Sequence, residues 1–357
     1  MLVDLDGDPD VAALIPTMGR HPDRLAACLR SLESQRSDLR IAIVCILNSS
    51  ESELPALPAP LPATVTIERP GINLGWSGAL SFGRSRTKAP LLWLVQDDMV
   101  VDDECLSELV AVLNDRPDLA MVAPIVVHDG VVPAGSCGGV LSEGIDTADF
   151  GMDHWLPAED VPISELDLDD LTELDYVPSR GTLIRAGVWD AVGGMDPAYY
   201  PVQWADVDLC TAVRRAGYDF SLVRKATVEH AGMGSTPGYF AVFLGQLHRV
   251  RFAEKWFGGG VPVSIIDPGV ATDLVGTVAV QATTKLSLLA AHVDQELKAA
   301  AAARAESARL RVELVRANEQ LSGVLWSRSW RATAPLRRLG GAVRSVQRLR
   351  GKVDPSG

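Results

Sequence analysis

The sequence predicts an α/β protein in which a mixed, mostly parallel sheet is flanked by helices. Two observations support this prediction. Apolar runs that indicate buried strands alternate with helical patterns through the first 125 residues, as expected for a sheet covered on both faces. The runs at 40–47 and 89–95 are continuous rather than alternating, which is typical of strands buried on both sides.

The first third of the chain gives the clearest pattern. At 21–35, Leu25, Cys28, Leu29 and Leu32 fall on one face of a helix. In chain order, we expect a strand at 11–16, this helix, strands at 40–47 and 63–70, a helix at 74–87 and a strand at 89–98 that ends at two carboxylates.

The middle of the chain is less regular. Residues 159–175 contain eight Asp or Glu and no Lys or Arg. We interpret 129–175 as a surface excursion with short strands. Regular structure then returns, and we expect a strand and a helix at 176–194, a helix and a strand at 208–230, and a helix packed on the sheet at 239–257.

A different pattern follows the Gly- and Pro-rich stretch at 258–269, which has the composition of a domain boundary. Apolar residues recur there with the 3.5-residue period of a coiled-coil seam. Ten of its twelve positions are apolar: Leu286, Leu289, Val293, Glu296, Ala300, Ala303, Ser307, Leu310, Leu314, Ala317, Leu321 and Val324. A lone alanine-rich surface helix is the alternative. We predict a domain at 1–265, a linker at 266–284, a coiled-coil helix at 285–325 that forms a homo-oligomer, and a tail at 326–357.

Charge is distributed unevenly. The net charge is −13, but residues 322–357 carry eight basic side chains and one acid, so the tail is +7 and the rest is −20. The acidic body disfavours nucleic-acid binding. The tail combines arginines with Trp326 and Trp330, which is typical of an interfacial helix on anionic lipid. We therefore expect peripheral contact with the inner face of the plasma membrane, with a disordered basic tail as the alternative.

The cysteines and the chain start favour a cytoplasmic location. Five cysteines are scattered without a CxxC pair, which indicates reduced, buried thiols. The acidic opening MLVDLDGDPD is not a secretory signal. No apolar run reaches the roughly 18 residues that a membrane span needs.

Two adjacent carboxylates, Asp97 and Asp98, end the strand at 89–98. Ligands of open α/β sheets gather outside the carboxyl ends of the strands. Adjacent carboxylates there repel each other unless they share a cation, and a divalent metal that holds a diphosphate would meet this need. Helix capping is the alternative, but it explains Asp102 and Asp103 rather than the strand-end pair.

Two further groups of side chains are candidates for catalysis or metal binding. Asp206 and Asp208 stand at the start of a predicted helix, and we expect them on related faces. Acidic residues are also common in a first helical turn because of the helix dipole. His230 ends a strand before a Gly-rich loop and should reach the same crevice, although a lone histidine is more often structural than a ligand.

Three blocks at 13–32, 72–101 and 180–236 together resemble the inverting glycosyltransferases of family 2, which have the GT-A fold. The first is ALIPTMGRHPDRLAACLRSL and the second is INLGWSGALSFGRSRTKAPLLWLVQDDMVV. In the third, Gly-Gly-x-Asp, Trp-x-Asp-x-Asp and Arg-Ala-Gly-Tyr occur in the family's order and spacing. The likeness covers about 11–260 and is strongest to the rhamnosyl- and galactofuranosyl-transferases of bacterial surface-polysaccharide assembly.

The resemblance implies a role for each matching residue. Asp206 takes the position of the catalytic base, and Asp208 is expected to brace the helix start. Asp98 takes the position of the metal-binding aspartate, with His230 as a further ligand. The remaining assignments are Pro16, Thr17, Arg20, Asn48, Asn73, Gly75 and Asp97 on the donor side, and Gly181, Trp204 and Asp208 on the acceptor side.

Three departures from the family pattern stand at Gln96, Ala205 and Leu47. Gln96 replaces the first acid of the metal motif, which can weaken base or ribose contacts. Ala205 replaces an acid before the base and removes a potential acceptor contact. Leu47 replaces an aspartate that commonly reads the nucleotide base. One metal aspartate and one base remain.

These observations predict a metal-dependent, inverting transfer of a sugar from a nucleotide diphosphate sugar to a hydroxyl. Rhamnose or galactofuranose is the expected sugar, and a lipid-linked or polysaccharide acceptor of the bacterial cell wall is the expected partner. A carboxylate plus an imidazole favours Mn²⁺ over Mg²⁺. The alternative is a catalytically lapsed GT-A scaffold that organises a glycan-assembly complex through its coiled coil. A sugar nucleotidyltransferase would need a Gly-rich basic loop where IPTMGRHPDR stands.

Overall fold

A computed structural model of the chain describes residues 8–49, 57–58, 61–62, 64–141, 152–167, 174–230 and 238–257, and further positions, mainly helical, between 278 and 333. The chain divides into two compact units, Met1–Lys285 and Leu286–Gly357. The first unit contains every strand of the described residues.

An eight-stranded sheet forms the centre of the first unit, with the order β3-β2-β1-β4-β11-β6-β12-β5. Strands β3, β2, β1 and β4 run parallel, and β12 runs parallel to β6. The antiparallel members are β11, between β4 and β6, and β5 at the edge. The strands are β1 (Val11–Thr17), β2 (Ile41–Leu47), β3 (Val65–Glu68), β4 (Leu91–Leu94), β5 (Met99–Val101), β6 (Leu119–Val127), β11 (Thr182–Arg185) and β12 (Asp219–His230). The predicted mixed, mostly parallel sheet is confirmed.

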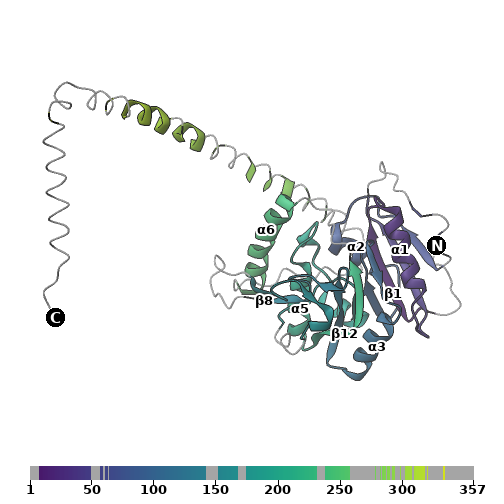
Figure 1. Ribbon diagram of the computed structural model, residues 1–357. Coiled ribbons are helices and arrows are strands. Elements are labelled where there is room, and N and C mark those ends of the chain that lie inside the picture. The colour runs from purple at the N-terminus through teal and green to yellow at the C-terminus, as the bar shows by residue number, and fades with distance from the viewer. Residues whose placement is uncertain are drawn as a thin grey trace, which may run out of the picture. The chain divides into compact units, whose positions relative to one another are not determined.

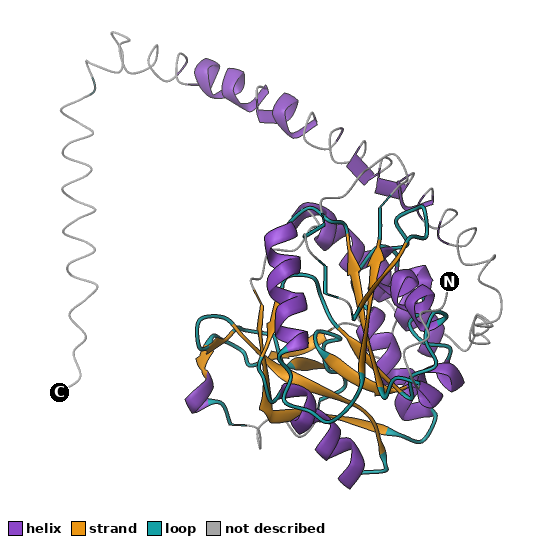
Figure 2. Ribbon diagram, turned by 90° about the vertical axis from the view of Figure 1, so that its right-hand side faces the viewer, coloured by secondary structure: helices purple, strands orange, loops and turns teal. Residues whose placement is uncertain are grey.

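Helices cover both faces of this sheet (Figures 1 and 2). The helices are α1 (Pro22–Glu33), α2 (Gly75–Arg84), α3 (Cys105–Asp115), α4 (Ala186–Val192), α5 (Ala205–Arg215) and α6 (Gly238–Phe257). In α1 the buried apolar residues are Leu25, Cys28, Leu29 and Leu32, so the predicted helical face is confirmed. The α4 helix ends at Gly193, whose φ of 80° is the left-handed conformation that glycine adopts without strain.

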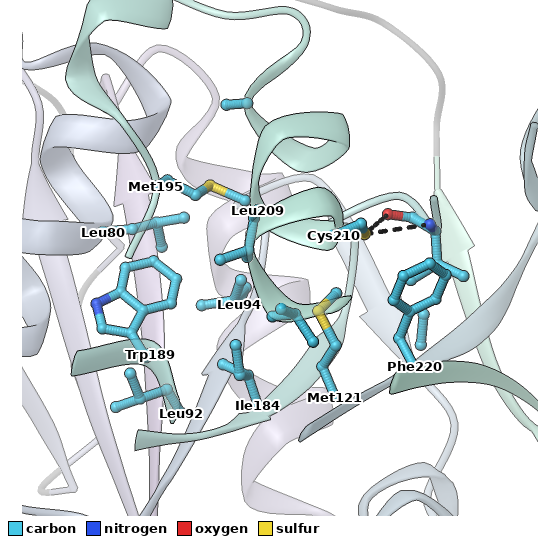
Figure 3. Packing of buried hydrophobic residues seen from close by; sticks show 14 of the residues in the cluster. Leu80, Leu92, Leu94, Met121, Ile184, Trp189, Met195, Leu209, Cys210 and Phe220 are labelled. Carbon is cyan, nitrogen blue, oxygen red and sulfur yellow. Dashed lines mark hydrogen bonds between the residues drawn. The ribbon is translucent and has the colours of Figure 1, made fainter. Parts of the chain in front are cut away.

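The two faces of the sheet bury two separate apolar clusters. Alternate residues of β1 divide between them: Ala12 and Leu14 face one cluster, whereas Val11, Ala13 and Ile15 face the other. The second cluster is closed by α1 and α3, and the first by α2, α4, α5 and α6. Figure 3 shows the first cluster, where side chains of neighbouring strands lie under α5.

The predicted excursion at 129–175 consists of short strands where it is described. Two small antiparallel pairs form it, apart from the main sheet. They are β7 (Val131–Val132) with β10 (Val161–Pro162), and β8 (Gly138–Leu141) with β9 (Met152–Leu156), followed by the 3₁₀ turn η1 (Ile163–Glu165).

The second unit is helical at its described positions, including 302–307 and 309–317. Apolar side chains of the predicted seam are exposed there in the single chain, with Leu310 51% and Leu314 70% exposed. The coiled coil and the four predicted parts of the chain remain predictions. The basic tail lies outside the described residues, apart from Thr333. Among the described helices, none is long and apolar enough to cross a membrane.

Candidate active site

The carboxyl ends of β1 and β4 bring Thr17 and Asp97 together. Leu14 of β1 pairs with Leu94 of β4, so both strands end at the same edge of the sheet. The Thr17 hydroxyl donates a hydrogen bond to Asp97 Oδ2 and accepts one from the backbone N–H of Gly19 at 3.0 Å. Burial and the charge of Asp98 raise the pKa of Asp97, against the lowering effect of the Thr17 hydrogen bond.

Strand pairing places His230 beside Asp98. The edge strand β5 runs antiparallel to β12, with His230 opposite Met99, the residue after Asp98. His230 Nε2 lies 3.3 Å from Asp98 Oδ1, and both side chains are largely buried. Burial would raise the pKa of Asp98, but the hydrogen bond and the charge of His230 outweigh it, so the pKa falls below its usual value.

This pair fits one side of a divalent metal site. A carboxylate oxygen and an imidazole nitrogen suit Mn²⁺, and 3.3 Å between them is close to the spacing of neighbouring ligands on an octahedral ion with bonds of about 2.1 Å. Among the described residues, no cluster of three or more His, Cys, Asp or Glu could complete the shell. The remaining ligands would have to be water and substrate oxygens, which is how diphosphate sites commonly hold such ions.

Two residues directly before β11, Arg180 and Gly181, lie between the end of β4 and Asp206. Gly181 donates its N–H to Leu94 O at 2.8 Å, and its carbonyl accepts from Trp93 Nε1 at 2.8 Å. Its φ is +74°, and a Cβ would lie 2.8 Å from Pro124 Cγ, so glycine is required here. Asp206 lies in the first turn of α5, within reach of the charge of Arg180, the residue before Gly181.

Asp206 therefore lies near the start of β11, the strand that pairs with β4. Its carboxylate accepts a hydrogen bond from the backbone N–H of Val207 at 3.1 Å. Burial raises the pKa of Asp206, while this bond, the charge of Arg180 and the backbone N–H of Ser179 oppose the rise. A partly buried carboxylate with a raised pKa beside one cation has the properties of a general base.

The backbone before α5 is strained. Gln203 and Trp204 have φ values of 80° and 66°, and non-glycine residues in this region cost about 1–3 kcal/mol each. The Trp204 ring packs against Phe252 of α6, with the ring centroids 5.3 Å apart. Ala205, one of the departures from the family pattern, is only 3% exposed. In this chain, position 205 belongs to the core.

Asp208 lies on the opposite side of α5 from Asp206. Two helical steps turn the direction by about 200°, so the expectation that the two carboxylates share related faces is wrong. Asp208 is 2% exposed and accepts hydrogen bonds from Tyr199 Oη at 3.0 Å, Trp256 Nε1 at 2.7 Å and Lys255 Nζ at 2.8 Å. Burial raises its pKa and the Lys255 ammonium opposes the rise. Asp208 thus ties α5 to α6 behind the site.

The residues expected on the donor side form a supported loop. Asn48 is buried, donates from Nδ2 to Gly75 O at 3.0 Å and accepts from Leu74 N at 2.6 Å. Asn73 Oδ1 accepts from Gly75 N at 2.8 Å. Gly75 has a φ of +67°, and a Cβ would lie 2.7 Å from the Tyr200 ring. The Asn48 amide therefore shapes the 73–75 loop rather than facing solvent.

The other two donor-side residues lie at the end of β1. Pro16 pairs with Ile46 of β2, one residue before the end of the strand. Arg20 is exposed just beyond it, in the loop that begins at the Thr17–Asp97 contact. Both stand at the edge of the sheet that carries the strand-end carboxylates.

Sequence reasoning missed Arg180. Its cation lies near Asp206 because β11 runs antiparallel to β4, which brings the start of β11 to the end of β4. The motif Ser-Arg-Gly directly before the strand residues Thr-Leu-Ile-Arg at 182–185 was the available signal. This motif indicates a position for Arg180 near the end of β4 only if the strand at 182–185 is assumed to run antiparallel to β4.

Residues 12–138 match the family model described as glycosyl transferase family 2. That segment contains Asp97 and Asp98 and ends before Asp206 and His230. Residues 12–138, about a third of the chain, are thus similar to family 2 glycosyltransferases, which agrees with the expected enzyme class.

Two individual proteins are similar to the chain. The fold is similar to a crystal structure of GalNAc-T7 with UDP, GalNAc and Mn²⁺, with a TM-score of 0.51 and 15% identity over 70% of this chain and 49% of the other. This likeness confirms the GT-A fold. A protein of Sinorhizobium fredii, "Uncharacterized protein y4gI", is 27% identical over 229 residues. The match covers 60% of this chain and 24% of that relative, so the chain spans about a quarter of its length.

Proposed function

We propose that the protein is a metal-dependent inverting glycosyltransferase that moves a sugar from a nucleotide diphosphate sugar to a hydroxyl group. The observation that carries the proposal is the connection of two carboxylates at one sheet edge. β5 pairs with β12 and sets His230 beside Asp98. Arg180 and Gly181, at the start of β11, link the end of β4 to the surroundings of Asp206, which supports a position for Asp206 at the same edge.

Asp206 is the base in this proposal. The acceptor oxygen attacks the anomeric carbon, its proton passes to the Asp206 carboxylate, and the bond from the anomeric carbon to the diphosphate oxygen breaks. The acceptor enters opposite the leaving diphosphate, so the anomeric centre is inverted. The raised pKa makes Asp206 a stronger base than an exposed aspartate, and the charge of Arg180 favours its ionised form.

Asp98 and His230 would hold the metal. A divalent cation supplies charge neutralisation for the leaving diphosphate. The mixed oxygen and nitrogen pair favours Mn²⁺, with Mg²⁺ as the alternative. The Thr17 hydroxyl fixes the neighbouring carboxylate, Asp97, beside the pair.

Replacement of Asp98 by alanine tests the metal role. We expect Asp98→Ala to weaken Mn²⁺-dependent binding of a nucleotide sugar about 100-fold or more, because it removes one of two protein ligands. The measurement is the thermal shift produced by nucleotide sugars with and without Mn²⁺. Asp102→Ala is the matched control, since the Asp102 carboxylate accepts from the backbone N–H of Glu104, just before α3. An unchanged Mn²⁺-dependent shift in Asp98→Ala would contradict the assignment.

Rhamnose or galactofuranose is the sugar we propose, on a lipid-linked or polysaccharide acceptor at the inner face of a bacterial plasma membrane. The support is the likeness of the block at 180–236 to that branch of the family. A thermal-shift screen of nucleotide sugars with Mn²⁺ tests the choice. Stabilisation by other sugars and by neither of these two would refute it.

The alternative function, a catalytically lapsed scaffold suggested by Gln96 and Ala205, has less support than the enzyme. Position 205 is buried, so its side chain would not meet an acceptor in any case. Hydrolysis of the donor in the presence of Mn²⁺ distinguishes the two functions, because a lapsed scaffold would show none.

The second unit is proposed to join copies of the chain through its seam. We expect light scattering to give an oligomer for the full chain and a monomer for the double variant Leu310→Arg, Leu314→Arg, because two charges would enter each apolar seam. Val312→Arg, Val315→Arg is the control, since Val312 and Val315 are 52% and 57% exposed but lie off the seam. A monomeric full chain, or equal dissociation of the control, would refute the coiled coil.

A further inference from the structure

A buried lysine near the end of the first unit contacts the segment that leads to Asp206. Lys285 is 5% exposed. Its ammonium donates to Ala198 O at 2.5 Å, to Tyr200 O, and to His248 Nε2 at 2.7 Å. An ammonium group has three N–H donors and no acceptor, so these three partners satisfy it. A buried amino group with three polar partners is a specific contact, and not a side chain that packing alone holds in place.

The two carbonyl acceptors of Lys285 belong to one stretch of backbone, residues 198–204. The stretch begins in the 3₁₀ turn η3 (Pro197–Tyr199) and ends at Trp204, the residue before α5. Its middle contacts the donor side of the site, because Pro201 O accepts from Trp76 N at 2.8 Å. The 198–204 segment thus lies between the donor loop and the base.

His248 holds the other end of this segment. Its Nδ1 lies 3.1 Å from Gln203 O. Because a carbonyl can only accept, Nδ1 carries the proton and Nε2 is free to accept from Lys285. Burial and the charge of Lys285 lower the pKa of His248 to about 3, so the ring stays neutral and the pair of contacts is compatible.

We infer that Lys285 is a positioning residue for Asp206: with His248, it fastens the 198–204 segment in the strained conformation that directs the base into the site. Gln203 and Trp204, with their left-handed φ values, need outside contacts to stay in that conformation. Lys285 and His248 contact the carbonyls at positions 198, 200 and 203. The inference rests on the proposed function only in naming Asp206 as the base.

The pH dependence of this contact has a definite sign. Burial and the charge of Arg251 lower the pKa of Lys285 from 10.5 to about 7, and Asp196 opposes the fall. A lysine released into water regains its ordinary pKa, so release takes up a proton between about pH 7 and 10.5. The docked state is therefore stabilised as the pH rises through this window and loses that stabilisation as the pH falls to about 7.

Hydrogen exchange on the full-length protein tests the inference without any substrate. In the wild type, we expect exchange of the 198–208 amides, corrected for its intrinsic pH dependence, to slow about tenfold between pH 7 and about pH 8.5. At about pH 8.5, Lys285→Met should exchange about tenfold faster than the wild type in this segment, and its corrected rate should not change with pH. Lys298→Met, at an exposed position of the second unit, is the matched control and should follow the wild type.

Three results would overturn the inference. One is equal exchange of 198–208 in the wild type and Lys285→Met at about pH 8.5. Another is faster exchange that extends equally to β1–β4, which would mean a general loss of stability. The third is a flat pH profile in the wild type, which decides the matter even if Lys285→Met does not fold. Under the proposed function, Lys285→Met also lowers kcat about tenfold with the donor KM unchanged. Absence of turnover in every variant would refute that function and leave the exchange result standing.

Discussion

Replacement of Asp206 by asparagine is expected to lower kcat for sugar transfer by about 10²–10⁴-fold, the usual contribution of a positioned general base. Asparagine keeps the oxygen that accepts from Val207 N but cannot take the acceptor proton. Donor binding should stay near the wild-type level, because Asp98 and His230 are unchanged. Steady-state kinetics and nucleotide-sugar thermal shifts measure the two properties separately. Activity above about one tenth of the wild type would show that Asp206 is not the base.

The same variant is expected to be more stable than the wild type at neutral pH. Burial raises the pKa of Asp206 in the folded protein, so the folded state binds this proton more tightly than the unfolded chain does. The ionised carboxylate therefore destabilises the fold at pH 7, and this effect disappears as the pH falls below the unfolded value of about 3.9. We expect Asp206→Asn to raise Tm at pH 7 and the difference to shrink on acidification. A lower Tm at pH 7 would mean that Asp206 has a structural role.

The elements of the sheet could be predicted because their sequences carry one consistent signal. The runs of β1, β2 and β4 are continuous and apolar, as strands buried between two layers of helices must be. The direction of β11 could not be predicted, because a strand buried on both faces has the same composition in either direction. The edge strand β5 has only three residues, too few for an apolar pattern to distinguish a strand from a turn.

The strand-end rule explains which part of the site was predictable. It identifies Asp97, Asp98 and Thr17 because parallel strands end at one edge of the sheet. It does not identify Lys285, which lies far along the chain from the carbonyls that it contacts. The left-handed backbone at Gln203 and Trp204 could not be predicted either. Glycine and asparagine are the residues that usually adopt this conformation, and neither stands at these positions. Such contacts depend on how loops pack and not on local pattern.

Replacement of Asp208 by alanine is expected to lower the free energy of unfolding by about 3 kcal/mol, since removal of one partner from a buried charged cluster leaves the others without compensation. Three donors lose their acceptor: Tyr199 Oη, Trp256 Nε1 and Lys255 Nζ. Lys255 keeps its contact with Asp196 at 3.2 Å, which limits the loss. Denaturant unfolding measures the change.

Asp206→Ala is the matched control for Asp208→Ala, because it removes the same group two residues earlier in the same helical turn. We expect the two variants to separate the two roles. Asp206→Ala should abolish turnover without loss of stability, whereas Asp208→Ala should unfold at lower denaturant concentration and retain measurable turnover well below its Tm. The reason is geometric: a turn of about 200° directs one carboxylate into the site and the other into the contact between α5 and α6. Equal stability of Asp208→Ala and the wild type, or the reverse assignment of the two effects, would refute this division.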